Sequence, residues 1–347
     1  MIIKIKTMLI LFLAFYFFSC NIDMNLFSNY WFKNDNFDFN VYPVLKKTDE
    51  EFKILLLADT QLEFHFESFT AISQTFELIE NEILKHKPDL IILLGDNISG
   101  GGFVNSSAAQ RLIMFLDSFK IPYALVMGNH DGYGYFWTED DNSKEVIANI
   151  YKNGLYSLFQ RGPANLGAGN YGINILNDEG LLIYSLILMD NSRGYFTKMQ
   201  VDWYEWFIAG INNLKYDQYY NLNDKPIPSM SFFHIPLPET SSLYDELKVT
   251  NPPLAAEYFR EEVGGRGAKN FGMFEKMKQM QSTTHLFFSH DHLNILNYEY
   301  QDIRFIYGIK TGYCYYFSPD RIGTTLITIS DCVLPNEIKV DISYSFY

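Results

Sequence analysis

Polar residues with the donor atoms of metal ligands follow five apolar segments of this 347-residue chain. The stretches are ADTQ at 58–61, GDN at 95–97, GNHD at 128–131, FHIPLPE at 233–239 and SHDH at 289–292. They offer carboxylate, amide and imidazole groups, namely Asp59, Gln61, Asp96, Asn129, His130, His234, His290 and His292. Oxygen donors mixed with imidazoles suit divalent ions such as Mn, Fe or Zn, and there are more donors than one ion needs. The residue types therefore predict a centre for two divalent metal ions.

Each stretch has a plain structural explanation when it is taken alone. A Gly-Asp pair is common in turns, and a single histidine at a strand end is more often a hydrogen-bonded structural residue than a ligand. All five stretches, however, follow segments that are built for burial. A buried carboxylate such as Asp59 requires a paired charge or a metal ion. His65, His86 and His285 lack this context, and we assign them no role.

The segments around these stretches predict strands that alternate with helices in the first half of the chain. Apolar runs at 52–58, 90–95 and 123–128 are typical of buried strands, and helical patterns lie between them at 68–87 and 108–119. This alternation indicates βαβ units on a largely parallel sheet, in which ligands collect at the carboxyl ends of strands. We therefore expect the five polar stretches to converge in space.

The second half of the chain is richer in strand patterns. We predict a helix at 200–213, strands at 171–176, 181–190, 229–235 and 284–290, and mostly strands after residue 294. There is no internal repeat and no obvious interdomain linker in the sequence. The predicted fold is one α/β domain over 51–347, with two sheets in its core and helices outside.

The net charge limits the kinds of ligand that the surface can bind. The formal charge is −14, and the isoelectric point is about 4.9. Nucleic acids are held by clustered lysines and arginines, and the sequence has no such cluster. We expect no broad nucleic-acid-binding surface, so a bound phosphate would have to be held by something other than surface charge.

The N-terminus has the pattern of an export signal. Lys4 and Lys6 precede an uncharged apolar run over 8–18, and a small residue precedes Cys20. The run has the length of a signal-peptide core and falls short of the about 20 residues that a membrane-spanning helix needs. A small residue before a cysteine resembles the lipobox of bacterial lipoproteins, in which the cysteine is lipidated.

We therefore interpret 1–20 as a signal peptide of the lipoprotein type, and 21–50 as a tether whose later part pairs as an edge strand. The expected location is the bacterial cell envelope, where a lipid on Cys20 would anchor the exported protein to the membrane. A secretory signal of a secreted or periplasmic protein and a plain apolar strand are the alternatives. Cys314 and Cys332 are either a disulfide pair or two buried free thiols.

The order of the polar stretches resembles that of the calcineurin-like metallophosphoesterases, whose motifs run D-x-H, GD, GNH(D/E), H and GH-x-H. The resemblance extends over about residues 52–330. The stretches GDNI, GNHD, FHIPLPE and HDHLN are similar to those of the purple-acid-phosphatase-like branch of single-domain enzymes. The resemblance implies a four-layer α/β/β/α fold.

The resemblance also implies a role for each residue of the site. Asp96 would bridge two divalent ions (Mn, Fe, Zn or Mg). Asp59 and His292 would hold the first ion, and the second would be held by Asn129, His234 and His290. His130 would be the general acid that protonates the leaving group, and Asp131 would orient it. Such ions clamp a phosphate ester and supply a bridging hydroxide as the nucleophile.

The leading hypothesis is therefore hydrolysis of a phosphomonoester in a small phosphorylated substrate. A phosphodiesterase or a nucleotide pyrophosphatase is the alternative among enzymes, because the metal ligands do not determine the leaving group. A non-catalytic surface lipoprotein that binds metal or a phosphorylated ligand is the alternative from another class.

The chain departs from the family pattern at two positions. Gln61 stands where the first motif has histidine, and Ser99 stands where purple acid phosphatases have a ligating tyrosine. Gln61 either coordinates through its amide oxygen, in a weakened first site that prefers harder ions, or reflects loss of activity. In the glycine-rich stretch 261–270, Arg266 and Lys269 are candidates for substrate binding, although a solvated surface loop also explains them.

Overall fold

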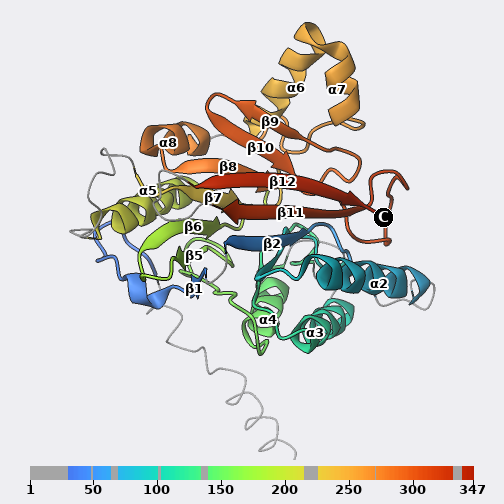
Figure 1. Cartoon of the computed structure of the whole chain (residues 1–347), viewed down its shortest axis with the longest axis horizontal. Coiled ribbons are helices and arrows are strands. Elements are labelled where there is room, and N and C mark those ends of the chain that lie inside the picture. Colours follow the sequence, from blue (N-terminus) through green and yellow to red (C-terminus); the bar gives the residue numbers. More distant parts are fainter. Residues whose placement is uncertain are drawn as a thin grey trace, which may run out of the picture.

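The computed structural model describes residues 30–47, 50–63, 69–100, 103–133, 140–214, 226–269, 271–330 and 338–347. Within these ranges the chain forms two β-sheets with helices outside them (Figure 1). The predicted α/β fold with a two-sheet core is confirmed.

Both sheets contain parallel and antiparallel strands. The larger sheet has the order β1-β5-β6-β7-β8-β10-β9 and contains β1 (Val44–Lys46), β5 (Tyr171–Leu176), β6 (Leu182–Leu188), β7 (Ser229–Phe232), β8 (Thr283–Phe288), β9 (Asn297–Tyr300) and β10 (Ile303–Tyr307). The smaller sheet has the order β12-β11-β2-β3-β4 and contains β2 (Glu51–Leu57), β3 (Leu90–Leu93), β4 (Tyr123–Leu125), β11 (Gly323–Ser330) and β12 (Lys339–Phe346). Strands β2, β3 and β4 run parallel, as do β6, β7, β8 and β10, so the carboxyl ends within each set lie at one edge of its sheet.

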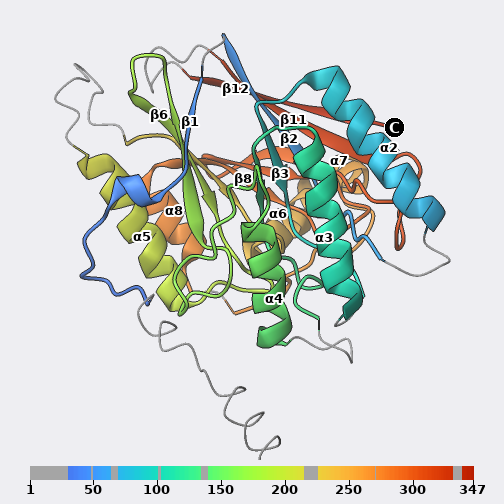
Figure 2. The ribbon, with the colours of Figure 1, turned by 90° about the horizontal axis from the view of Figure 1, so that it is seen from below.

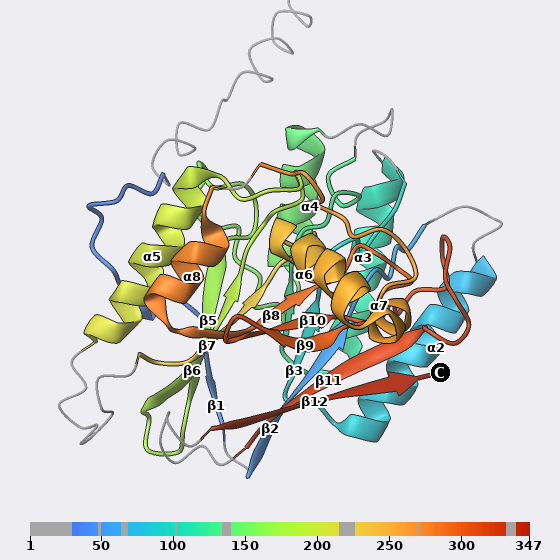
Figure 3. The same cartoon turned by 90° about the horizontal axis from the view of Figure 1, so that it is seen from above.

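Helices cover the outer faces of both sheets. The described helices are α2 (Phe69–His86), α3 (Phe103–Ser118), α4 (Asp141–Lys152), α5 (Lys198–Asn213), α6 (Pro238–Thr250), α7 (Pro252–Tyr258), α8 (Met273–Met280) and the 3₁₀ turn η2 (Phe39–Val41). Two further views show α2 and α3 on one side of the sheets and α5 and α8 on the other (Figures 2 and 3). The order of the layers is therefore α/β/β/α, as the family resemblance implies.

Two buried clusters hold the layers together. The first cluster contains Ile54 and Ile92 of the smaller sheet and Ile173 and Phe287 of the larger one. The second cluster joins the other face of the larger sheet to its helices and contains Trp203, Phe207, Phe274 and Phe288. Strands β2 and β3 are buried on both faces, which explains their nearly continuous apolar sequence.

The predicted elements agree best where the apolar pattern is long. The helix predicted at 68–87 is α2, which differs by one residue at each end. The patterns do not predict α4, α6, α7 or α8, which are short or mostly polar, so apolar periodicity says little about them. The region predicted to be mostly strand after residue 294 includes an irregular segment, 308–322, between β10 and β11.

The N-terminal segment 30–47 packs against the domain. Strand β1 pairs in parallel with β5 at the edge of the larger sheet, within the segment where an edge strand is expected. Trp31 and Phe37 both contact the ring of Trp206 in α5, with centroids 5.8 and 5.3 Å away. The segment predicted as a tether is therefore a docked arm from residue 30 onward.

The predicted signal peptide and Cys20 lie outside the described residues, and so does Cys332. Cys314 is a buried free thiol. Among the described helices, none has the length and apolar character needed to cross a membrane.

Candidate metal centre

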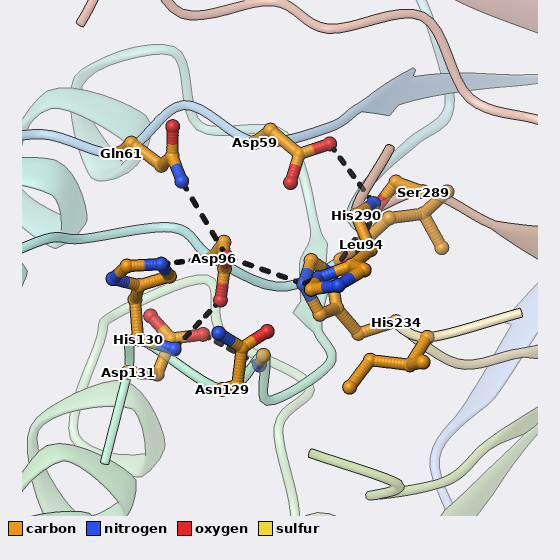
Figure 4. A network of polar contacts seen from close by, with 12 residues as sticks. Asp59, Gln61, Leu94, Asp96, Asn129, His130, Asp131, His234, Ser289 and His290 are labelled. Carbon is orange, nitrogen blue, oxygen red and sulfur yellow. Dashed lines mark hydrogen bonds and ion pairs between the residues drawn. The ribbon is translucent and has the colours of Figure 1, made fainter. Parts of the chain in front are cut away.

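Five strand ends bring the polar stretches together, as expected. In the smaller sheet, β2, β3 and β4 lead into Asp59, Asp96 and Asn129. In the larger sheet, β7 leads into His234 and β8 into His290. The side chains from both sheets meet around Asp96 (Figure 4).

The backbone turns sharply at three of these strand ends. The φ angle is +48° at Asp59, +46° at Asp96 and +75° at His290, in the left-handed region that residues other than glycine rarely adopt. Each such residue costs about 1–3 kcal/mol, and this kind of strain clusters at functional sites. Gly128 lets the segments after β3 and β4 lie close together, because a Cβ at this position would be 2.1 Å from the Asp96 backbone nitrogen.

Asp96, His234 and His290 offer three donor atoms within 4.8 Å of one another, and we refer to this group together with Asn129 as the second site. Nε2 of His234 lies 3.3 Å from Oδ2 of Asp96 and 3.3 Å from Nδ1 of His290. Nδ1 of His234 lies 2.8 Å from the Leu94 carbonyl oxygen, which can only accept, so Nδ1 carries the hydrogen. When the ring is neutral, as it is on binding a metal ion, Nε2 carries the lone pair.

Charges within the second site shift the pKa values of its members. Burial opposes a charge on His234, but the Asp96 carboxylate outweighs it and raises the pKa of His234 to about 9. Burial alone would raise the pKa of the Asp96 carboxyl, and the His234 charge instead holds it below its usual range. Burial and the nearby His234 lower the pKa of His290 to about 4. Positive charge is therefore favoured next to Asp96, where a cation would lie.

Two buried oxygen atoms beside these groups have no hydrogen-bond partner among the described residues, namely Oδ1 of Asn129 and Oδ1 of Asp59. The Asn129 amide nitrogen faces the Tyr133 hydroxyl at 3.5 Å, which leaves the amide oxygen available. Buried oxygen atoms are costly to leave without a partner, and a bound cation would satisfy them. The second site therefore fits a divalent ion, and its mixture of imidazole and oxygen donors suits Mn, Fe or Zn.

Asp59 and His292, next to Asp96, form what we call the first site. Nδ1 of His292 lies 3.0 Å from the Tyr316 carbonyl oxygen, so Nε2 presents its lone pair, 3.7 Å from Oδ1 of Asp59. Oδ2 of Asp59 accepts a hydrogen bond from the His290 amide at 3.3 Å. Burial raises the pKa of Asp59 to about 6 and lowers that of His292 to about 2. The first site has two oriented donors besides Asp96.

His130 lies beside Asp96 with part of its ring open to solvent. Its amide donates to Oδ1 of Asp96 at 2.8 Å, and its Nε2 lies 3.7 Å from Oδ2. The ring packs edge-on against Tyr133 and Tyr315, with centroids 4.7 and 5.4 Å away. Burial lowers the pKa of His130. Because the side chain keeps 18% of its surface exposed, it can contact a molecule bound at the metal centre.

The expectation that Asp131 orients His130 is wrong for this structure. The buried carboxylate accepts five hydrogen bonds, from the amides of Asn97, Ile98 and Gly128, the Asn97 side chain and the Tyr151 hydroxyl. Nδ1 of His130 has no partner among the described residues. Asp131 is a structural link between the ends of β3 and β4, because these donors already use both of its oxygen atoms.

Comparison with known proteins identifies the family. The profile of a family described as calcineurin-like phosphoesterase matches residues 52–320, which is most of the chain. The chain belongs to the calcineurin-like phosphoesterases.

Relatives of this phosphoesterase include plant and yeast proteins. "Probable inactive purple acid phosphatase 14" of Arabidopsis thaliana is 25% identical over 314 residues, which cover 80% of this chain and 74% of that protein. "Phosphatase DCR2" of Saccharomyces cerevisiae is 31% identical over 218 residues, 56% of this chain and 36% of the yeast protein. A solved dimetal phosphatase from Danio rerio matches with a TM-score of 0.49 and 12% identity, covering 86% of this chain and all of the other.

The side-chain amide of Gln61 in this phosphoesterase contacts both Lys310 and Asp96. Oε1 accepts a hydrogen bond from Nζ of Lys310 at 2.9 Å. An ammonium group can only donate, so this contact fixes the orientation of the amide. Nε2 of Gln61 then faces Oδ2 of Asp96 at 3.5 Å. The structure therefore directs the Gln61 oxygen to Lys310 and the amide nitrogen to Asp96, and the role of Gln61 as a metal ligand stays a prediction.

The two candidates for substrate binding have different surroundings. Arg266 donates to Asp245 of α6 at 2.9 Å, and both side chains are largely exposed. Its charge is thus matched at the surface, and the structure gives no support for a substrate role. Nζ of Lys269 lies 5.8 Å from the centroid of the Tyr195 ring and lines a small cavity with it. The role of Lys269 in the phosphoesterase stays a prediction.

Three residues at the centre are absent from the predicted set: Lys310, Tyr316 and Gly264. A Cβ at Gly264 would lie 2.5 Å from the His290 ring, so the glycine-rich loop supports that ligand through its backbone. Tyr316 stacks on the His292 ring at 4.3 Å. Lys310 is a lone charge in the segment FIYGIKTGY, and a lysine within an apolar run is the one signal that points to a buried charge.

The phosphoesterase has a cavity of about 320 Å³ whose lining includes none of the residues of the two metal sites. Its lining includes Asn191, whose side-chain oxygen accepts a hydrogen bond from the His234 amide. A smaller recess lined by Asn129 shares Lys144 and Arg193 with this cavity. Asn191 therefore connects this cavity to the backbone of His234 in the second site.

Proposed function

We propose that this phosphoesterase hydrolyses phosphate monoesters at its metal centre. The proposal rests on one observation: ring nitrogens of His234 and His290 and the carboxylate of Asp96 converge beside a partly exposed His130. Bound divalent ions would supply positive charge to the phosphoryl oxygens and activate the attacking water. The family match supports this reaction class.

In this proposal the chain supplies ligands, orientation and a proton. Leu94 and Tyr316 hold the ligand histidines, His234 and His292, through backbone carbonyls, so that their free nitrogens face the centre. Nε2 of His130 is the proton donor to the leaving oxygen. Burial favours its neutral form, whereas a phosphate ester brings negative charge into the site and favours the protonated form.

A substrate comparison tests the proposed reaction. We expect purified protein with added Mn²⁺ or Zn²⁺ to hydrolyse p-nitrophenyl phosphate faster than bis-p-nitrophenyl phosphate. Faster hydrolysis of the diester would favour a phosphodiesterase or pyrophosphatase instead.

Substitution of His130 tests its proposed role as the general acid. Replacement of His130 by Gln should lower kcat by about 100-fold to 10,000-fold for an alkyl phosphate, the usual contribution of general acid catalysis. The loss should be smaller for p-nitrophenyl phosphate, because p-nitrophenolate leaves readily without a proton. Equal losses for both substrates would count against proton donation by His130.

One observation favours a second candidate, a non-catalytic protein that binds metal or a phosphorylated ligand. The Lys310 ammonium donates a hydrogen bond to the amide oxygen of Gln61, which stands at the histidine position of the first motif. A related plant protein is also named a probable inactive purple acid phosphatase. Binding of inorganic phosphate to the metal-loaded protein, with no hydrolysis of any phosphate ester at high enzyme concentration, would support this candidate.

For location we propose export and lipid anchoring through Cys20, supported by the charge and apolar pattern of residues 1–20. Expression of the full chain in a bacterial host and cell fractionation test this. We expect Cys20→Ser to release the protein from the membrane fraction. A variant that stays in the membrane with an uncleaved N-terminus would identify the segment as an anchor instead.

A further inference from the structure

Lys310 is a buried lysine that contacts the first site. It is 1% exposed, and its Nζ donates to the Asp59 backbone oxygen and to Oε1 of Gln61, both at 2.9 Å. It follows β10 in a segment that lies along the end of β2, where the Thr311 amide donates to the Ala58 oxygen at 2.7 Å. Lys310 is therefore held in place by the backbone at the end of β2 and the start of β11, both in the smaller sheet.

The contact with Lys310 reverses the role of the side chain at position 61. A histidine there would present a lone pair to the first ion. Gln61 instead turns its oxygen to the ammonium and presents an N–H group to Oδ2 of Asp96. A donor thus faces the carboxylate oxygen that would bridge the ions.

The charge of Lys310 also opposes a cation at the first site. Its ammonium lies against the backbone of Asp59, a ligand of that site. Two positive charges a few ångströms apart in a buried region repel strongly, because the interior screens them poorly. The second site has no such competitor among its described contacts, in which its donor atoms face one another.

We propose that Lys310 and Gln61 together replace the histidine ligand and part of the charge of the first ion, so that the chain holds one divalent ion firmly, at the second site. The proposal rests on the metal centre of the proposed function. Lys310 acts here as a positioning residue, because it sets the orientation of Gln61 and does not contact the substrate.

Metal stoichiometry tests this inference directly. Metal-free protein is titrated with Co²⁺ and with Mn²⁺, and bound ions are counted by equilibrium dialysis with elemental analysis. Wild-type protein should bind one equivalent tightly, with any second ion at least about 100-fold weaker, in the range expected when a ligand shell is disrupted. The double variant Gln61→His/Lys310→Met should bind two equivalents, and its Co²⁺ absorption should gain intensity up to the second equivalent.

Controls separate this effect from loss of a buried charge in general. Lys144→Met removes another lysine that is mostly buried, paired with Asp190 just after β6, and should leave the stoichiometry at one. Single variants at 61 and 310 show whether both changes are needed. A double variant that binds only one ion would overturn the inference.

The wild-type titration also decides the matter if the double variant does not fold. Two tight equivalents in wild-type protein, with hydrolysis present, would overturn the inference and leave the proposed function intact. Absence of any tightly bound ion would remove the inference and the metal-dependent function together.

Discussion

The two halves of the metal centre share one architecture and differ in what fills it. In the second site, the Leu94 carbonyl orients His234 so that its Nε2 faces both Asp96 and Nδ1 of His290. In the first site, Asp59 and His292 are oriented in the same way, but Lys310 and Gln61 lie where a further ligand would be.

The difference teaches that strand ends set the position of a site and side chains set its charge. Burial raises the pKa of Asp59 to about 6, and the positive Lys310 is one of the groups that opposes this rise. A lysine can thus perform the neutralising role of an ion without its chemistry, because an ammonium cannot coordinate water or a phosphoryl oxygen. In the proposed arrangement the first site keeps its shape but binds its ion weakly.

The largest expected effect comes from the carboxylate that both sites share. Asp96→Asn should lower kcat/KM by more than about 100-fold, beyond the loss of an outer partner, because a neutral amide offers one weak donor oxygen. The left-handed backbone of Asp96 accepts asparagine, so the fold should persist. Steady-state kinetics and circular dichroism check this. More than about a tenth of the activity remaining would show that Asp96 is not a metal ligand that the reaction needs.

Paired substitutions should separate the two sites. His234→Ala should abolish retention of the tight ion during gel filtration, because it removes a central donor of the second site. His292→Ala should leave that ion bound, since His292 contacts only the first site among the described residues. Elemental analysis of both variants gives the answer. Equal loss of metal from the two variants would show that the tight ion does not depend on the second site alone.

A smaller effect is expected where the support is structural. Asp131→Asn should lower the free energy of unfolding by about 1–3 kcal/mol, because the new amide N–H group would face buried donors that Asp131 now satisfies. Urea denaturation measures this. The pH profile of kcat should keep its shape if Asp131 does not act through His130. A shifted acid limb at unchanged stability would restore the predicted orienting role.

The smallest effect concerns His285, a histidine of β8 outside the centre. Burial, and secondarily Arg304, lower its pKa to about 4, from about 6.5 in an unfolded chain. The unfolded state therefore binds more protons between these values, so His285 makes stability fall as the pH drops from about 6.5 to about 4. His285→Gln should remove this part of the slope in urea denaturation at several pH values. Because His285 lies outside the metal centre, this variant also separates acid unfolding from metal release. An unchanged slope would exclude the contribution of His285.

The parts of the fold that the sequence predicts are those with local causes. Long apolar runs produce β2 and β3, and the polar stretch after each strand lies at a sheet edge because parallel strands end together. The Lys310–Gln61 contact joins residues 249 positions apart, and no local pattern reports it. Asp131 shows the same limit, because four of its donors come from the segments after β3 and β4 and the fifth is the Tyr151 hydroxyl of α4.

The left-handed backbone at Asp59, Asp96 and His290 has a consequence for the stability of the whole protein. These turns raise the free energy of the folded chain, whereas an ion binds the folded chain only. By mass action an ion at about 100 times its Kd adds about 2.7 kcal/mol of stability. The melting temperature should therefore rise with the concentration of divalent ion. The amide hydrogens at the strand ends should show the largest decrease in exchange rate when the metal-free protein binds the ion.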